Sequence, residues 1–215
     1  MNKRWGAGLL AAAMLFLVAP SVNAEEVVSE DVYQWVQSTS RQNYYFNKQE
    51  IYFGVDDKGD ISPDILLVPV LKTYDQVQKE DVIAKRRWKM QSTKGYNDLV
   101  GAAQFLRFDL KNKTVELIKQ DDLDSDWGIL EEFTVNKVAD LDKFSEKDVD
   151  GKFFRAIIGY AMRHLDEISI RSENRYKTKL TNSALKKITE FKEPGSTHKA
   201  PPEKANHGDK HRHSK

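Results

Sequence analysis

The feature that most constrains this chain is a broad apolar stripe between Phe153 and Ile168. Large apolar residues recur there at three- and four-residue spacings: Phe153, Phe154, Ile157, Ile158, Ala161, Met162, Leu165 and Ile168. This period predicts one amphipathic α-helix, with Ser145, Asp148 or Asp150 capping its start. Such a face needs an apolar surface to pack on, and each buried side chain contributes about 1.5–3 kcal/mol.

The preceding part of the chain supplies that surface, because it alternates apolar and polar residues as β-strands do. Strands are predicted at 32–38, at 44–46 continuing through 49–55, and at 65–73, 104–110, 114–120 and 127–135. The clearest hairpin joins 104–110 to 114–120. Pro69 cannot donate a ladder hydrogen bond, so we expect a bulge there or an edge position for its strand.

The sequence therefore predicts an α+β fold. We expect a small antiparallel sheet of about five to six strands packed by the C-terminal amphipathic helix. A short helix or a helical turn is predicted between Asp75 and Lys89, where the spacing of apolar residues changes. Its basic run, Lys85 to Arg87, is expected to be a solvated helix face.

The first 24 residues have the three parts of a secretory signal peptide in the right order. Lys3 and Arg4 come first, an apolar run follows from Trp5 to Val18, and Val22-Asn23-Ala24 offers small residues for cleavage. The alternative is a retained N-terminal anchor, but the run is shorter than the roughly 20 residues that span a bilayer. We expect an exported protein in the periplasm or on the surface of a bacterium, with no transmembrane segment in the mature chain.

The mature chain would begin near Glu25. An α+β domain is predicted over 25–170, and a basic extension over 171–191 with a short helix at Ala184 to Phe191. A disordered tail rich in His, Lys and Pro is predicted over 192–215. Loss of Lys3 and Arg4 leaves 32 basic against 33 acidic residues. This balance argues against nucleic acid as a partner, because phosphate binding needs a basic excess.

The chain has no cysteine. This excludes disulfides, thiol catalysis and thiolate metal sites, so the fold depends on its core alone. There is also no Gly-x-Ser-x-Gly elbow, no Walker A motif and no dinucleotide-binding glycine fingerprint. No cofactor is predicted. A hydrolase that uses a pair of carboxylates remains open, since any two acids could meet in space.

Four histidines lie in the tail: His198, His207, His211 and His213. Imidazoles bind Zn²⁺, Cu²⁺ or Ni²⁺, so these four are the predicted metal ligands. The alternative is a solvated polar tail.

Two further patterns have both a metal-binding and a structural interpretation. Asp122, Asp124 and Asp126 alternate as in a calcium loop, but Trp127 and Phe133 occupy two essential positions of that motif. An acidic turn between strands is favoured. His164 and Glu167 are three residues apart and can share a helix face, yet a metal site needs three or four converging donors. A structural histidine is favoured.

The order of elements from Trp35 to Tyr160 resembles the surface-adhesin protein E-like domains of exported bacterial proteins. The resemblance is carried by Trp35, Tyr44-Tyr45-Phe46-Asn47, Ile51-Tyr52-Phe53, the hairpin segment Phe108-Asp109-Leu110-Lys111-Asn112-Lys113, and a helix near the end. Many members carry a cysteine where Leu110 stands and a partner at the closing helix. The resemblance implies an antiparallel sheet backed by a helix, and no binding residue is transferred.

Together these patterns predict an exported, non-enzymatic binding or interaction protein, adhesin-like in character. Its partner would be a protein or another component of the cell envelope. A metal-binding protein that uses the histidine tail, and an envelope hydrolase with a carboxylate pair, are the two alternatives.

Overall fold

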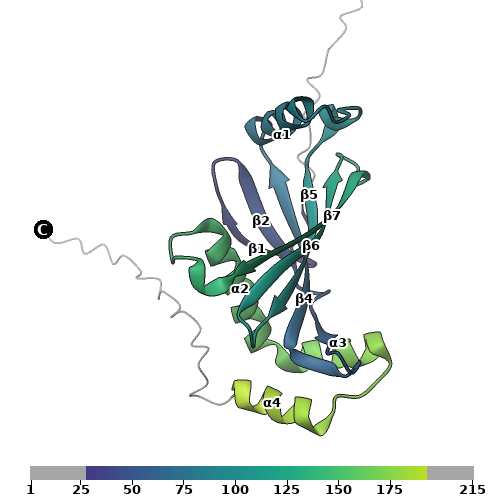
Figure 1. The fold of residues 1–215 in the computed structure, drawn as a ribbon, viewed down its shortest axis with the longest axis vertical. Helices are drawn as coiled ribbons and strands as arrows, with labels where there is room; N and C mark the ends of the chain where they lie inside the picture. Colours follow the sequence, from purple (N-terminus) through teal and green to yellow (C-terminus); the bar gives the residue numbers. More distant parts are fainter. Residues whose placement is uncertain (1–27, 193–215) are drawn as a thin grey trace, which may run out of the picture.

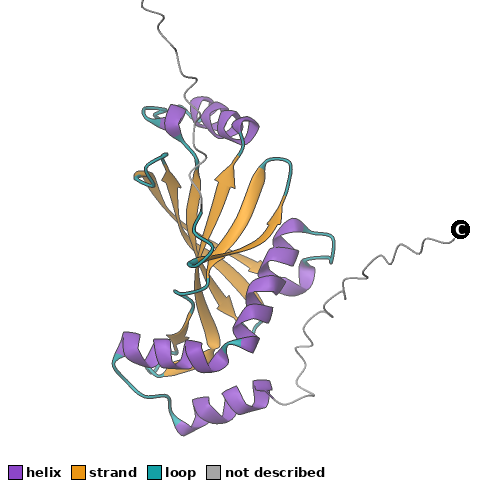
Figure 2. Cartoon of the chain, turned by 180° about the vertical axis from the view of Figure 1, so that it is seen from behind, coloured by secondary structure: helices purple, strands orange, loops and turns teal. Residues whose placement is uncertain are grey.

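The computed structural model describes residues 28–192. The predicted signal peptide and the four tail histidines lie outside these residues. The strands are β1 (Tyr33–Ser38), β2 (Gln42–Asn47), β3 (Tyr52–Val55), β4 (Ile61–Tyr74), β5 (Gly101–Asp109), β6 (Thr114–Leu123) and β7 (Ile129–Asp140). The α-helices are α1 (Gln76–Trp88), α2 (Val149–Arg163), α3 (Leu165–Tyr176) and α4 (Asn182–Lys192). Figures 1 and 2 show their arrangement from opposite sides.

All strands join one antiparallel sheet in the order β1-β2-β4-β5-β6-β7, and β3 pairs with β4. The α+β prediction is confirmed. The sheet has seven strands rather than five to six, because the segment from 42 to 55 forms two strands. The Asn47 side chain accepts hydrogen bonds from the backbone N–H groups of Gln49 and Glu50, which closes a turn between β2 and β3.

The prediction for Pro69 is wrong. β4 is an interior strand, and its pairing with β5 runs without a register shift through Pro69. On its other side, β2 pairs as far as Val70 and β3 starts at Leu67. Pro69 therefore lies in the gap between β2 and β3. No strand residue is paired with Pro69 on that side, so its lack of a backbone N–H removes no hydrogen bond from the sheet.

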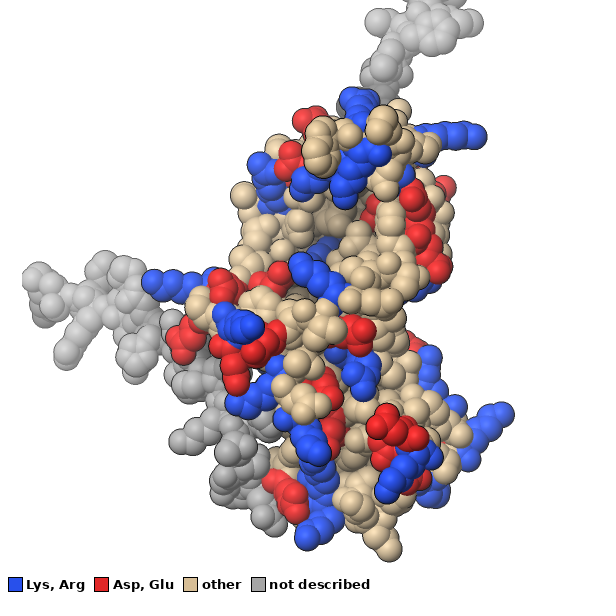
Figure 3. Space-filling model, in the orientation of Figure 1, with Lys and Arg blue, Asp and Glu red and all other residues tan. Residues whose placement is uncertain are grey.

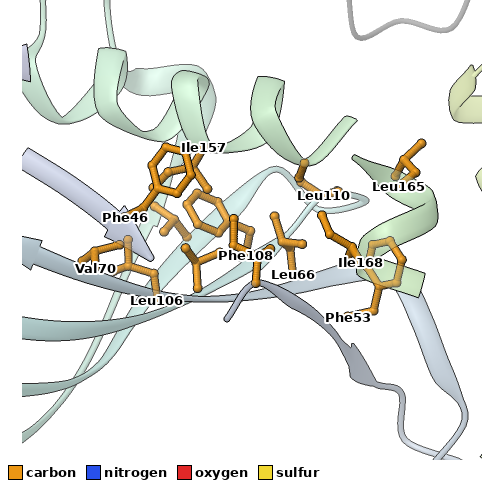
Figure 4. Close-up of a cluster of buried hydrophobic side chains, with 14 of the residues drawn as sticks. Phe46, Phe53, Leu66, Val70, Leu106, Phe108, Leu110, Ile157, Leu165 and Ile168 are labelled. Atoms are coloured by element: carbon orange, nitrogen blue, oxygen red, sulfur yellow. The ribbon is translucent and has the colours of Figure 1, made fainter. Parts of the chain in front are cut away.

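The core lies between the sheet and α2, α3 and α4. Figure 4 shows the part formed by the sheet, α2 and α3. Phe46, Leu66 and Phe108 from the sheet are fully buried with Ile157 of α2 and Ile168 of α3. The predicted apolar helix face thus packs on the predicted sheet. Leu180, Ala184 and Ile188 extend the same cluster into α4.

The single helix predicted over the apolar stripe is in fact two helices. α2 ends at Arg163 and α3 begins at Leu165, with His164 between them outside helical geometry. Leu165 and Ile168 remain buried after this break. α3 packs on β3, whereas α2 lies nearer β1 and β2 (Figure 2). The break lets one apolar stripe follow two directions across a twisted sheet.

At the other end of the sheet, α1 begins as predicted, with the Asp75 side chain accepting from the backbone N–H of Gln78. The expectation of a solvated basic face is wrong for Arg86, which is 5% exposed. Its guanidinium pairs with Glu131 of β7 and stacks over the Tyr96 ring at 4.0 Å. Lys85 and Arg87 are exposed as expected.

Candidate functional site

A groove of about 430 Å³ runs between the edge strand β1 and helix α2. We call it the β1–α2 groove. Its lining residues are Gln34, Trp35 and Val36 of β1, Phe46 of β2, and Lys152, Arg155, Ala156, Gly159, Tyr160 and Arg163 of α2. The floor is apolar and the α2 side carries three cations, so the groove combines hydrophobic surface with positive charge.

A bulge in β1 shapes the strand side of the groove. Trp35 is opposite Tyr45 and Gln37 is opposite Tyr44, so Val36 is an extra residue in the pairing with β2. Val36 packs against the core cluster, and the Gln37 side chain donates to the carbonyl oxygen of Val149 at the start of α2. The bulge thereby fixes β1 to α2 at one end and leaves Trp35 52% exposed at the groove.

Aromatic rings form the deeper part of the groove. Phe46 contacts Tyr160 edge-to-face, with ring centroids 5.1 Å apart. Tyr160 in turn stacks on His164 at 4.1 Å. Burial raises the pKa of the Tyr160 hydroxyl, as does the nearby Glu167 carboxylate, against the lowering by Arg171 and Arg163. The neutral hydroxyl of a tyrosine can donate a hydrogen bond. Gly159 leaves open space beside these rings, because it has no side chain to fill the groove.

The three cations are presented in different ways. Arg155 is held in place, since its guanidinium donates to the carbonyl oxygen of Ser145 at 2.9 Å. Lys152 and Arg163 are exposed, and neither takes part in the ion pairs found among residues 28–192. No acidic residue lines the groove. A ligand there would meet uncompensated positive charge.

β1 is one of the two outer strands of the six-strand path. No strand among residues 28–192 pairs with its outer edge. Two β1 backbone groups have other partners, since the Tyr33 N–H donates to the carbonyl oxygen of Ser29 and the Trp35 carbonyl oxygen accepts from the Gln34 side chain. β7, the opposite outer strand, is less suited to pairing with another strand. Asn136 there has a positive φ of 50°. Charged residues such as Glu132 and Lys137 also line β7, as is common in protected edges.

A second groove, of about 480 Å³, lies between α3 and α4. Its charged residues neutralise one another: Lys192 pairs with Asp166, and Glu173 pairs with the neighbouring Lys179. These pairs make it less suited than the β1–α2 groove to attract a charged ligand.

The structure brings His164 and Glu167 together, with Nδ1 and Oε1 3.3 Å apart. No cluster of three His, Asp or Glu side chains suited to a metal ion occurs in residues 28–192. His164 is instead part of the aromatic stack with Tyr160. The tail histidines remain predicted ligands, since they lie outside the described residues.

The run Asp122, Asp124, Asp126 does not converge on one point. Asp124 and Asp126 form the predicted acidic turn, in which the Asp124 carboxylate accepts from the backbone N–H groups of Asp126 and Gly128. Asp122 lies in β6, is 4% exposed, and accepts from the hydroxyl of Tyr96 at 2.9 Å.

Two pairs of carboxylates meet between β6 and β7. Asp122 lies opposite Glu131, and Asp121 lies opposite Glu132. Lys119 pairs with both members of the second pair.

The Tyr96 hydroxyl oxygen lies 2.9 Å from Asp122 and 3.3 Å from Glu131, and its one proton can be donated to either carboxylate. Burial is the main cause that raises the pKa of Asp122, against the lowering by Gln120, Tyr96 and Arg86. Arg86 pairs with Glu131, and neither groove described above is lined by Asp122 or Glu131. The arrangement ties α1 to the sheet.

The groove residues were not predicted from the sequence, although α2 carries a signal for them. Lys152, Arg155, Gly159 and Arg163 recur at helical spacing beside the buried stripe. This second stripe marks one flank of the helix as basic and partly open. That this flank of α2 lines a groove depends on the position of β1, which lies more than a hundred residues earlier in the chain.

None of the helices between residues 28 and 192 is long and apolar enough to cross a bilayer. Comparisons with protein-family models, with characterised proteins and with solved structures find no match to this chain.

Proposed function

We propose that this protein is an exported interaction module that binds an extended, acidic segment of a partner protein in the β1–α2 groove. The observation that carries the proposal is the groove itself: an apolar floor, an exposed tryptophan and three cations lie beside the free edge of a sheet. The predicted signal peptide and the resemblance to adhesin-like domains support an exported binding protein.

The charge of the groove favours an acidic ligand. Lys152, Arg155 and Arg163 have no acidic neighbour among the lining residues, so a carboxylate-bearing segment would offset this charge. Trp35 and Tyr160 are suited to anchor a bound chain, because large aromatic side chains dominate binding energy at protein interfaces. The tyrosine hydroxyl and the tryptophan ring also tolerate partial solvent exposure.

The free edge of β1 favours an extended ligand. A peptide that adds to a sheet edge gains main-chain hydrogen bonds, and every second side chain points into the neighbouring groove. The groove lies along this edge, so its apolar floor would receive the alternate side chains. Acidic residues of the ligand would then reach the cations of α2.

The proposal is tested by selecting peptides from a display library against the chain from Glu25 to Lys215, which contains all described residues. We expect the selected peptides to contain Asp or Glu alternating with apolar residues. Their affinity should fall at least tenfold for the variant Lys152→Glu/Arg163→Glu, since two rim attractions become repulsions. Isothermal titration calorimetry measures this change.

Lys111→Glu is the control for reversal of a charge outside the groove. Lys111 is exposed in the β5–β6 turn, remote in sequence from the groove, and takes part in none of the ion pairs among residues 28–192. The control should bind the selected peptides as the native chain does. Equal affinity for all three proteins, or selection of basic peptides, would contradict the proposal.

A further inference from the structure

The end of the molecule formed by α1 carries two large apolar side chains in solvent. Trp88, the last residue of the helix, is 83% exposed, and Met90 is 94% exposed. Single exposed apolar residues are common on soluble proteins, but two neighbouring ones of this size mark an interaction surface. Arg86 rather than Trp88 occupies the buried position at this end of the helix.

The backbone holds both side chains outward. Met90 has a positive φ of 55°, and its N–H donates to the carbonyl oxygen of Arg87. The next N–H, of Gln91, donates to the carbonyl oxygen of Arg86. These bonds close the helix end in a fixed turn. The exposure of Trp88 and Met90 is therefore built into the helix terminus.

Four cations lie within six residues of Trp88 and Met90 in the sequence: Lys85, Arg87, Lys89 and Lys94. All are exposed, and none belongs to an ion pair among residues 28–192. Figure 3 shows basic side chains gathered over α1 at the top of the molecule. We call the six residues the apical patch. Its positive charge contrasts with the even balance of acids and bases in the whole chain.

We propose that the apical patch docks the protein on the surface of an anionic lipid bilayer. Tryptophan prefers the boundary between lipid headgroups and hydrocarbon, and lysine or arginine beside it is attracted to anionic headgroups. The combination of both signals is what peripheral membrane binding requires. α1 lies at one end of the long axis and α3 and α4 lie toward the other (Figure 1). A protein bound through α1 would keep the β1–α2 groove accessible, and the two proposals are independent.

The test uses the chain from Glu25 to Lys215 with Trp35 and Trp127 replaced by Phe. Trp88 is then the single tryptophan of this chain, so it alone gives the tryptophan fluorescence. Vesicles of phosphatidylcholine and phosphatidylglycerol in equal parts are compared with vesicles of phosphatidylcholine alone. We expect a blue shift of Trp88 emission and co-flotation with the anionic vesicles. Both effects should weaken with salt, because the attraction is screened.

Two variants of the native chain locate the binding surface in the flotation assay. Trp88→Ala/Met90→Ser removes the apolar part, and Lys85→Glu/Lys89→Glu reverses part of the charge. Each lost cation should weaken vesicle binding about fivefold, with reversal costing more. The control, Ile129→Ser/Val138→Ser, changes two exposed apolar residues of β7 and should bind normally. Circular dichroism verifies that all variants fold.

Unchanged vesicle binding by both patch variants would overturn the proposal and assign the binding to another part of the chain, such as residues 193–215. Absence of binding by the native chain to anionic vesicles would overturn it as well. Equal binding to both kinds of vesicle would also overturn it.

Discussion

The hydroxyl of Ser172 links helix α3 to the backbone of Phe53 in β3. It accepts a hydrogen bond from the Phe53 N–H at 2.8 Å and donates to the carbonyl oxygen of Ile168 at 2.6 Å. Ser172 is fully buried. A single helix side chain thus satisfies a strand N–H that has no neighbouring strand to accept it, and α3 covers what would otherwise be an open sheet edge.

Replacement of Ser172 by Ala should lower the free energy of unfolding by about 1–3 kcal/mol, because the Phe53 N–H would remain buried without an acceptor. Ser169→Ala is the matched control. Ser169 donates the same kind of hydrogen bond, to a carbonyl oxygen four residues earlier at 2.6 Å. Its replacement by Ala leaves no strand N–H without an acceptor, so the free energy of unfolding should fall by less than about 0.5 kcal/mol. Urea denaturation measures both values, and similar losses for the two variants would contradict this account.

Asp122→Asn should change how stability depends on pH. Burial raises the Asp122 pKa above its ordinary value of 3.8 in the folded protein. The stability that comes from protonated Asp122 is therefore complete below pH 3.8 and is lost as the pH rises through the folded-state pKa. The unfolding free energy of the native chain, minus that of Asp122→Asn, should fall as pH rises toward neutral. A difference that is constant or increases with pH would refute the assignment.

Ile157→Ala tests the packing of α2 on the sheet. Ile157 is completely buried, so truncation leaves a cavity and should cost about 2–5 kcal/mol. Ile170→Ala, on α3, removes the same atoms from a side chain that is 60% exposed. Ile170→Ala should change the free energy of unfolding by no more than about 0.5 kcal/mol. Equal effects of the two substitutions in thermal or urea unfolding would show that α2 does not pack as described.

Gly159→Ala should separate stability from binding. A Cβ at Gly159 would have its nearest neighbour, Nη1 of Arg163, at 3.5 Å, which is an ordinary contact. The helix should gain about 0.5–1 kcal/mol from the better helix former. The added methyl group occupies the β1–α2 groove, so affinity for the selected peptides should fall severalfold. A stabilised variant that binds these peptides as tightly as the native chain would place the ligand elsewhere.

Much of the fold follows from local patterns in the sequence. The 3.6-residue period of the apolar stripe identified the helix face that packs on the sheet, and alternation identified the strands, including the hairpin of β5 and β6. Asp75 was within the predicted start of α1. These features depend on neighbours a few residues apart, which a sequence displays directly.

What the sequence could not show depends on contacts between distant segments. Pro69 looked like an edge residue because the gap between β2 and β3 exists only in the assembled sheet. Arg86 looked solvated because its partners, Tyr96 and Glu131, come from a later turn and from β7. The groove was missed for the same reason, since β1 and α2 meet across more than a hundred residues.

Amide hydrogen exchange of the chain from Glu25 to Lys215, saturated with a peptide from the display selection, tests the central claim most directly. A segment that adds to the sheet should slow exchange in β1, at Tyr33–Ser38, and leave β7, at Ile129–Asp140, unchanged. Bound peptide with unaltered exchange in β1, or with slowed exchange in β7, would contradict the claim that the β1–α2 groove is the binding site.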